Sequence, residues 1–94
     1  MTAAPLVRAC VQVPGAPRPL LERVEWLTPY AAETIAEDAL RAGRGARLAL
    51  VVPAEAGRAG LDRVRHQFAW LRARGLEVDV RTAGRRGDTA GRAA

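Results

Sequence analysis

The sequence contains no lysine, one cysteine, one histidine and few aromatic residues. With a single cysteine, Cys10, the chain excludes an internal disulfide and a CxxC metal site. Nucleophilic or acid–base catalysis needs a base within hydrogen-bond reach of a nucleophile. Neither Cys10 nor His66, the one histidine, has such a partner visible in the sequence beyond Asp62, four residues before His66. We therefore expect no catalytic residue, no bound metal and no cofactor.

Long apolar runs are also missing. A membrane-spanning helix needs about 20 consecutive apolar residues, and nothing in the chain approaches that length. The apolar stretch nearest the N-terminus is interrupted by Arg8, Gln12 and Pro14, which does not fit a signal peptide. The single cysteine agrees with a reducing compartment. The sequence therefore favours a soluble cytoplasmic protein.

What the sequence does have is the composition of a small globular domain. The chain has 94 residues, of which 49% are hydrophobic and 27% charged. That length suits one domain and not two. Because 20 residues are alanine, which buries little area, the core is expected to be small and built on valine and leucine.

Arginine supplies all 15 basic charges against 10 acidic ones, which gives a net charge of +5. A basic balance favours nucleic acid, anionic lipid or an acidic protein as the partner. Part of the excess lies in the segment from Gly84 onward, where Arg85, Arg86 and Arg92 face only Asp88. Arginine without lysine, beside abundant alanine and glycine, is also what GC-rich codons produce. The charge thus supports nucleic-acid binding as one hypothesis among several.

Hydrophobic periodicity divides the chain into short elements. Residues 20–27 fit a strand or a helix, but Thr28 is a good N-cap and Pro29 is favourable only at the first helical position. We therefore assign a strand before Thr28 and a helix from Pro29 to Ala42, stopped by Gly43. The patterns predict strands over 6–13, 20–27, 46–52 and 76–81, helices over 29–42 and 61–74, and loops over 14–19 and 53–60.

These elements predict an α/β fold, with α+β as the alternative: a small four-stranded mixed sheet in the order β-β-α-β-α-β. The first two strands pair as an antiparallel hairpin, and the later connections are right-handed crossovers. The apolar run 46–52 is typical of a strand covered on both faces. If the strands follow sequence order, both helices lie on one face, and the open face invites dimerisation. Residues 1–5 are expected to be a flexible end, 6–83 one domain and 84–94 a disordered tail.

The outer side of the second helix is the first candidate binding surface. A tryptophan among basic residues suits a protein interface or the stacking and phosphate contacts of nucleic acid. The alternative is that Trp70 covers the sheet edge or lies beneath the proline loop. The second helix carries an apolar stripe of Leu61, Val64, Phe68 and Leu71. The candidate residues, at helical spacing on the opposite side or beside this stripe, are Arg63, Arg65, His66, Gln67, Trp70, Arg72 and Arg74.

The loops before the two helices are the second candidate. Ligands bind beyond the carboxyl ends of parallel strands in open α/β sheets, and helix starts offer free amides to anions. The candidate residues are Thr28, Gly57, Arg58 and Gly60. No GxxxxGK or GxGxxG motif supports them, and both glycines are equally explained as turn residues.

The sequence thus leads to three functional hypotheses. The first is a small non-catalytic binding, adaptor or regulatory module that acts as a homodimer or as a subunit of a larger assembly. The second is a nucleic-acid-binding protein that uses the basic second helix and Trp70. The third is an enzyme or binder of a small anionic ligand at the loops before the helices.

Overall fold

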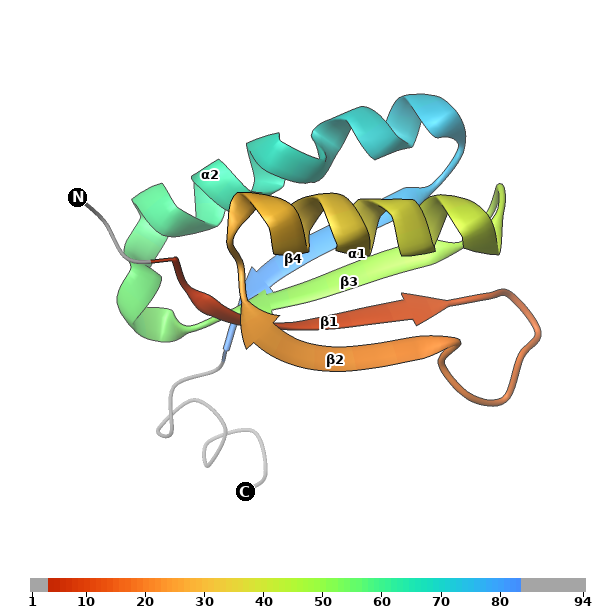
Figure 1. Cartoon of the computed structure of the whole chain (residues 1–94), viewed down its shortest axis with the longest axis horizontal. Helices are drawn as coiled ribbons and strands as arrows, with labels where there is room; N and C mark the ends of the chain where they lie inside the picture. The colour runs from red at the N-terminus through yellow and green to blue at the C-terminus, as the bar shows by residue number, and fades with distance from the viewer. Residues whose placement is uncertain (1–3, 84–94) are drawn as a thin grey trace, which may run out of the picture.

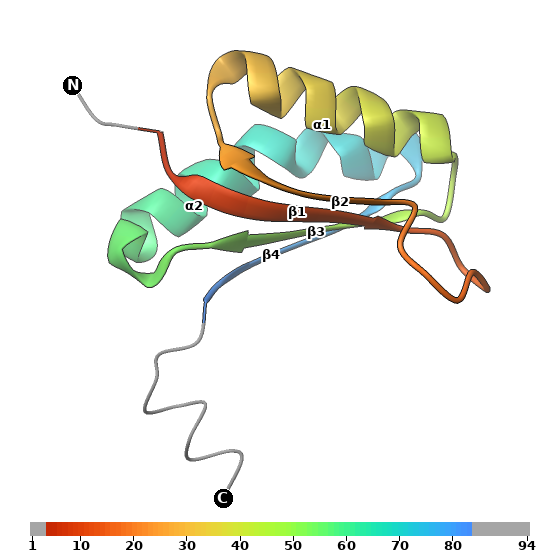
Figure 2. The ribbon, with the colours of Figure 1, turned by 60° about the horizontal axis from the view of Figure 1, so that its bottom comes forward.

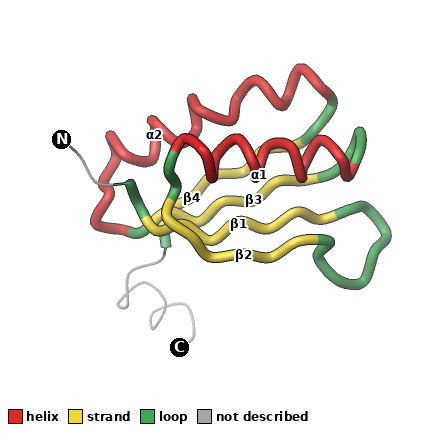
Figure 3. The backbone as a smooth tube through the Cα atoms, in the orientation of Figure 1, coloured by secondary structure: helices red, strands yellow, loops and turns green. Residues whose placement is uncertain are grey.

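The computed structural model describes residues 4–83, and the predictions for residues 1–3 and 84–94 lie outside that range. The element order β-β-α-β-α-β is the predicted one (Figures 1 and 3). The strands are β1 (Leu6–Gln12), β2 (Leu21–Trp26), β3 (Arg47–Val52) and β4 (Glu77–Thr82); the α-helices are α1 (Pro29–Ala42) and α2 (Gly57–Phe68); and two 3₁₀ segments are η1 (Ala54–Ala56) and η2 (Ala69–Arg74).

The sheet has four strands in the order β2-β1-β3-β4, so the strands do not follow the order of the chain. Strand β1 is antiparallel to both β2 and β3, while β3 and β4 are parallel. The connections from β2 to β3 and from β3 to β4 cross the sheet in the same direction. Two crossovers of one hand and one direction place their helices on the same face. Figure 2 shows α1 and α2 together on one side of the sheet, which confirms the mixed sheet with both helices on one face.

Helix α1 begins and ends where the sequence predicts. The Thr28 hydroxyl accepts a hydrogen bond from the Ala31 N–H at 3.1 Å, and Pro29 is the first helical residue. At the other end the Gly43 N–H donates to the Leu40 carbonyl at 3.1 Å, and its φ of 96° lies where a side chain would be strained. Both ends of α1 can be predicted from the sequence because each cap depends only on neighbouring residues.

The second helix differs from the prediction at both ends. It was expected over 61–74 after a loop, but η1 and the start of α2 occupy part of that loop. Gly60 lies within α2, and packing there excludes a larger side chain, because a Cβ would lie 2.7 Å from the Ala56 Cβ. After Phe68 the chain tightens into η2. A 3₁₀ turn repeats every three residues, which keeps Phe68 and Leu71 both buried against the sheet.

The core lies between the sheet and the two helices. Its largest fully buried side chains are Phe68, Ile35, Leu48, Leu50, Leu71, Val7, Val11, Val52 and Val64. The other face of the sheet carries no helix within residues 4–83 (Figure 2). The prediction that β3 is covered on both faces is therefore wrong: Leu48 and Leu50 are buried, whereas Ala49 and Val51 are half-buried on the open face. Their small apolar side chains produced the continuous hydrophobic run.

Candidate interaction surfaces

The predicted basic face of the second helix does not form one surface. The change from α2 to η2 alters the angular spacing of the side chains, and the seven residues separate. His66 is exposed, and the carboxylate of its expected neighbour Asp62 lies 3.7 Å from the Arg65 guanidinium instead. The other six form three pairs: Arg63 with Gln67 in a groove, Trp70 with Arg74 on the surface, and Arg65 with Arg72 against β4.

Arg65 and Arg72 bind the outer edge of β4. The Arg65 Nη2 donates to the Val80 carbonyl at 3.3 Å, and the Arg72 Nη2 donates to the Val78 carbonyl at 3.0 Å. These hydrogen bonds come from charged donors, which make stronger bonds than neutral ones. Two of the arginines assigned to a partner surface therefore contact the protein's own backbone.

The carbonyls of Val78 and Val80 do not take part in the hydrogen bonds between β3 and β4. The N–H groups of Glu77 and Ala83 donate to β3-side carbonyls at 2.9 and 2.7 Å, so the odd-numbered residues of β4 face β3. Because backbone groups alternate in direction along a strand, those of Val78 and Val80 point away from it. An unpaired strand edge is a template for another chain. Two arginines of the second helix thus occupy the outward carbonyls of Val78 and Val80 on that edge.

Trp70 and Arg74 form a separate pair. The Arg74 Cζ lies 5.9 Å from the centroid of the Trp70 ring, within the range of a cation–π contact. Trp70 remains 45% exposed, is not part of the buried core and is not among the residues that line the cavity beneath the proline loop. Because Arg74 lies over one face of the Trp70 ring, only the other face is open for stacking on a nucleic-acid base.

The second predicted site falls beside a groove at the carboxyl ends of β2 and β3. The groove encloses about 840 Å³, and Arg63, Gln67 and Gly60 line it. Of the other predicted anion-binding residues, Gly57 and Arg58 do not line it, and the Thr28 hydroxyl is used as the α1 cap. Its remaining lining residues are Ala4, Pro5, Leu6, Trp26, Leu27, Pro29, Pro53, Glu55, Ala56, Ala59 and Val64.

This groove is mainly apolar, and its charges oppose one another. The cation of Arg63 shares the wall with the carboxylate of Glu55, so the groove offers no net positive charge to an anion. Leu6 and Trp26 are among its apolar lining residues, and they lie opposite each other where β1 and β2 pair at that end of the sheet. The sequence predicted a site at this end of the sheet, but it did not predict the apolar lining of the groove.

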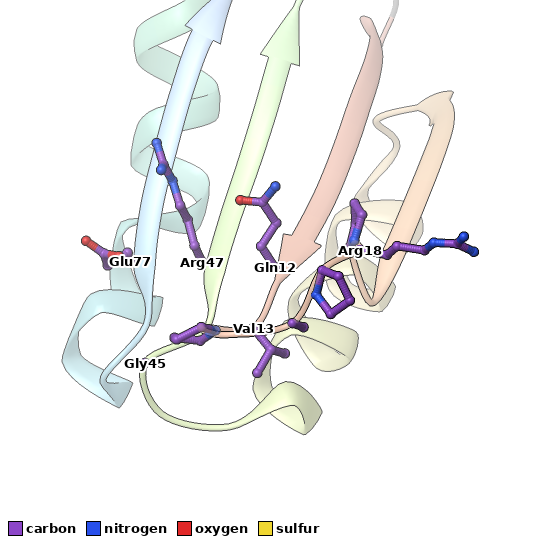
Figure 4. A pocket seen from close by; sticks show the side chains of 10 residues that line it. Gln12, Val13, Arg18, Gly45, Arg47 and Glu77 are labelled. Carbon is purple, nitrogen blue, oxygen red and sulfur yellow. The ribbon is translucent and has the colours of Figure 1, made fainter.

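A smaller cavity of about 360 Å³ lies at the opposite end of the sheet, beneath the proline loop (Figure 4). Gln12 of β1 and Arg47 of β3 lie on neighbouring strands there, with Glu77 of β4 beside them. The Arg47 Nη2 is bonded to an Asp79 carboxylate oxygen at 3.1 Å. This cavity lies at the amino ends of β3 and β4, away from the edge where a ligand was predicted.

The open face of the sheet is charged on its β4 side. Asp79 accepts hydrogen bonds there from Arg81 and Arg47. The bond from Arg81, more than that from Arg47, holds the pKa of the Asp79 carboxyl below its ordinary value, against a smaller opposing effect of burial. Asp79, Arg47 and Arg81 are therefore paired with one another within the chain.

The β2 side of the open face instead exposes large apolar side chains beside the charged Arg8 and Glu22. Leu6 is opposite Trp26 and Arg8 is opposite Val24 in the β1–β2 register. The exposed fractions are 43% for Leu6, 58% for Val24 and 60% for Trp26, and Leu20, just before β2, is 62% exposed. We call these four residues the apolar strip. The sequence contains a signal for the strip, because Leu20, Val24 and Trp26 are all even-numbered positions of one alternating segment. Alternation alone does not show whether the even-numbered or the odd-numbered side chains are buried.

The outer backbone edge of β2 lies next to the apolar strip. The Leu27 N–H donates to the Pro5 carbonyl at 2.8 Å, which marks these two as a hydrogen-bonded pair. By alternation the backbone groups of Glu22, Val24 and Trp26 point away from β1. Within residues 4–83, the bond from the Thr28 N–H to the Trp26 carbonyl, at 2.9 Å, is the only one found for these groups. No arginine of the described chain occupies this edge as Arg65 and Arg72 occupy that of β4.

Cys10 lies half-buried on the open face, opposite Glu22. Burial first, and then the nearby Glu22 charge, raise the pKa of the thiol. A raised pKa keeps the sulfur protonated at neutral pH and makes it a poor nucleophile.

Metal and membrane features are absent from the part of the chain that the structure describes. No cluster of three or more His, Cys, Asp or Glu side chains there could hold a metal ion, and no helix of residues 4–83 has the length and apolarity to cross a membrane. Comparison with known proteins adds no relative: no protein-family model, no curated protein and no solved structure matches this chain.

Proposed function

We propose that the protein is a non-catalytic interaction module that binds a strand of a partner protein along β2, as a homodimer or as a subunit of a larger assembly. The observation that carries the proposal is the difference between the two sheet edges. Arginines occupy the free carbonyls of β4, while the corresponding groups of Glu22 and Val24 on β2 have no partner within residues 4–83. An open strand edge binds an added strand through main-chain hydrogen bonds.

The apolar strip supplies the second support. Val24 and Trp26 expose more than half of their surface on the open face, directly beside the free edge. Grouped exposed apolar side chains mark interaction surfaces, and tryptophan is enriched among the residues that dominate binding energy. A strand added to β2 would bury part of the strip on one face while its backbone satisfies the edge.

The other two hypotheses receive less support. A nucleic-acid surface would need the arginines of the second helix together, but Arg65 and Arg72 contact the β4 backbone. A small-anion site would need net positive charge in the groove, where Glu55 opposes Arg63. A cytoplasmic location remains a prediction from the sequence.

The test offers the dilute protein a display library of random short peptides and maps where the selected peptides bind. We expect binders with alternating apolar residues that slow the hydrogen exchange of the Val24 amide. Val24→Pro is the matched variant, because it removes an outward N–H that the β1 pairing does not use, and proline is tolerated on such an edge. Binders that leave Val24 exchange unchanged, binders that retain affinity for Val24→Pro, or a selection without binders would each contradict the proposal.

A further inference from the structure

We propose, building on the proposed function, that the strand added to β2 is β2 of a second copy of this chain. The two strands pair antiparallel about a two-fold axis at Val24, which joins two four-stranded sheets into one continuous sheet. Three features support this pairing: the direction of the backbone groups of β2, the charges of β2 and the arginines bound to the opposite edge.

The backbone restricts the possible registers. Only Glu22, Val24 and Trp26 direct their N–H and C=O groups outward, so an antiparallel partner must match even residues with even residues. An axis at Val24 pairs Val24 with itself and Glu22 with Trp26 of the second copy. All three outward residues of each strand then take part in the ladder.

The charges select the same register. An axis at Val24 places Arg23 opposite Glu25 of the second copy, and symmetry repeats this pair. Opposite charges directly across two strands are stabilising, and like charges are destabilising. Moving the axis by one residue sets Arg23 against Arg23 or Glu25 against Glu25. The sequence of β2 is therefore complementary to itself in one register.

The Arg23 side chain is already held where this pairing needs it. Its guanidinium nitrogens lie 3.3 Å from a Glu25 carboxylate oxygen and 3.2 Å from an Asp38 oxygen of α1. The side chains of Arg23 and Glu25 are 33% and 31% exposed, so both remain accessible from the edge. A positioned guanidinium loses less side-chain freedom when a second carboxylate arrives.

On the open face the same axis brings the two apolar strips together. Val24 meets Val24 of the second copy, and each Trp26 lies on the diagonal from the other copy's Val24, within reach of an aromatic side chain. A single two-fold contact thus satisfies the β2 edge, pairs the charges on the helix side and covers apolar surface on the other side.

The experiment measures the mass of the full chain by sedimentation over a range of concentrations. We expect a dimer that dissociates on dilution. Arg23→Glu alone and Glu25→Arg alone each set like charges across the axis at both symmetric pairs, which should weaken the dimer by about tenfold or more. An equimolar mixture of these two variants should dimerise again, because in the mixed dimer every pair across the axis joins one acidic and one basic side chain.

Matched controls carry the same charge changes elsewhere. Arg58→Glu and Glu33→Arg change exposed helix positions outside β2, and both variants should dimerise as the unaltered chain does. The mixture also controls for damage within each chain, since rescue that requires both variants cannot come from an intrachain ion pair. Val24→Pro keeps both charges and should abolish the dimer by removing its central donor.

The outcomes separate this inference from the proposed function. A chain that stays monomeric while selected peptides still protect the Val24 amide overturns self-pairing and leaves strand binding at β2 intact. A dimer that both single variants retain, or that their mixture does not restore, overturns the register. A dimer that survives Val24→Pro, together with peptides that ignore Val24, overturns both.

Discussion

The two edges of the sheet differ in what the covering helix offers them. Beside β4 the second helix carries arginines, and Arg65 and Arg72 donate to the edge carbonyls. Beside β2 the helix α1 is acidic, and Asp38 forms an ion pair with the Arg23 side chain rather than contacting the strand backbone. A carboxylate cannot donate a hydrogen bond to a carbonyl, whereas a guanidinium has five N–H donors. In this fold the arginines of the second helix therefore reach the carbonyls of Val78 and Val80, whereas Asp38 of α1 is engaged by a side chain of β2.

This difference also explains the basic character of the second helix. Arginine excess alone suggests a nucleic-acid partner. In this fold Arg65 and Arg72 occupy the β4 edge, which hinders its pairing with another chain, as inward-reaching charges do on many natural edge strands. Net charge was thus no direct guide to the partner, because part of it acts within the chain.

The largest expected effect comes from detaching the second helix. Phe68 is 1% exposed in the core between α2 and the sheet. Phe68→Ala should lower the free energy of unfolding by about 3–5 kcal/mol, through lost burial and the cavity left behind. Urea unfolding measures this loss. Hydrogen exchange should show the amides at the two ends of β4 that donate to the β3 side, those of Glu77 and Ala83, losing more protection than the Leu27 amide at the end of β2, and equal losses would contradict the comparison.

A smaller effect follows from removing the arginines while the helix stays in place. The double variant Arg65→Ala/Arg72→Ala should lose about 1 kcal/mol of stability, because the bonds are charge-assisted but water can replace exposed donors. Its β4 edge should then promote association at high concentration. Light scattering and urea unfolding test both effects, with Arg63→Ala on the groove side of the same helix as the control. A double variant that behaves like Arg63→Ala would show that the arginines do not protect the edge.

The smallest expected effect concerns pH and the charged half of the open face. The pKa of Asp79 is lowered in the folded protein, chiefly by its hydrogen bond from Arg81. Because the pKa of Asp79 is lower in the folded state, its contribution to the free energy of unfolding is complete above the unfolded-state pKa of about 3.9. The contribution disappears as the pH falls through the folded-state pKa. Thermal unfolding temperatures from pH 5 downward should therefore fall less steeply for Asp79→Asn than for the unaltered chain. Identical slopes would show that Asp79 contributes nothing to acid sensitivity.

Much of the fold followed from local patterns in the sequence. The helix 29–42 was predicted to its last residue, because Thr28, Pro29 and Gly43 act through neighbouring backbone groups. The second helix was less predictable: Gly60 suggested a loop, but its hydrogen side chain is what the Ala56 contact requires. A single sequence shows that a glycine is present and not which neighbour excludes a larger side chain.

The identity and order of the strands and helices could be read from the chain itself, since periodicity and capping are properties of adjacent residues. Three features could not: β1 lies between β2 and β3, Val24 and Trp26 face solvent, and Arg65 and Arg72 reach β4. Each of these depends on pairings between distant segments, and alternation is the same whichever face of a strand is buried. The contrast between the protected and the open edge exists only once those segments are brought together.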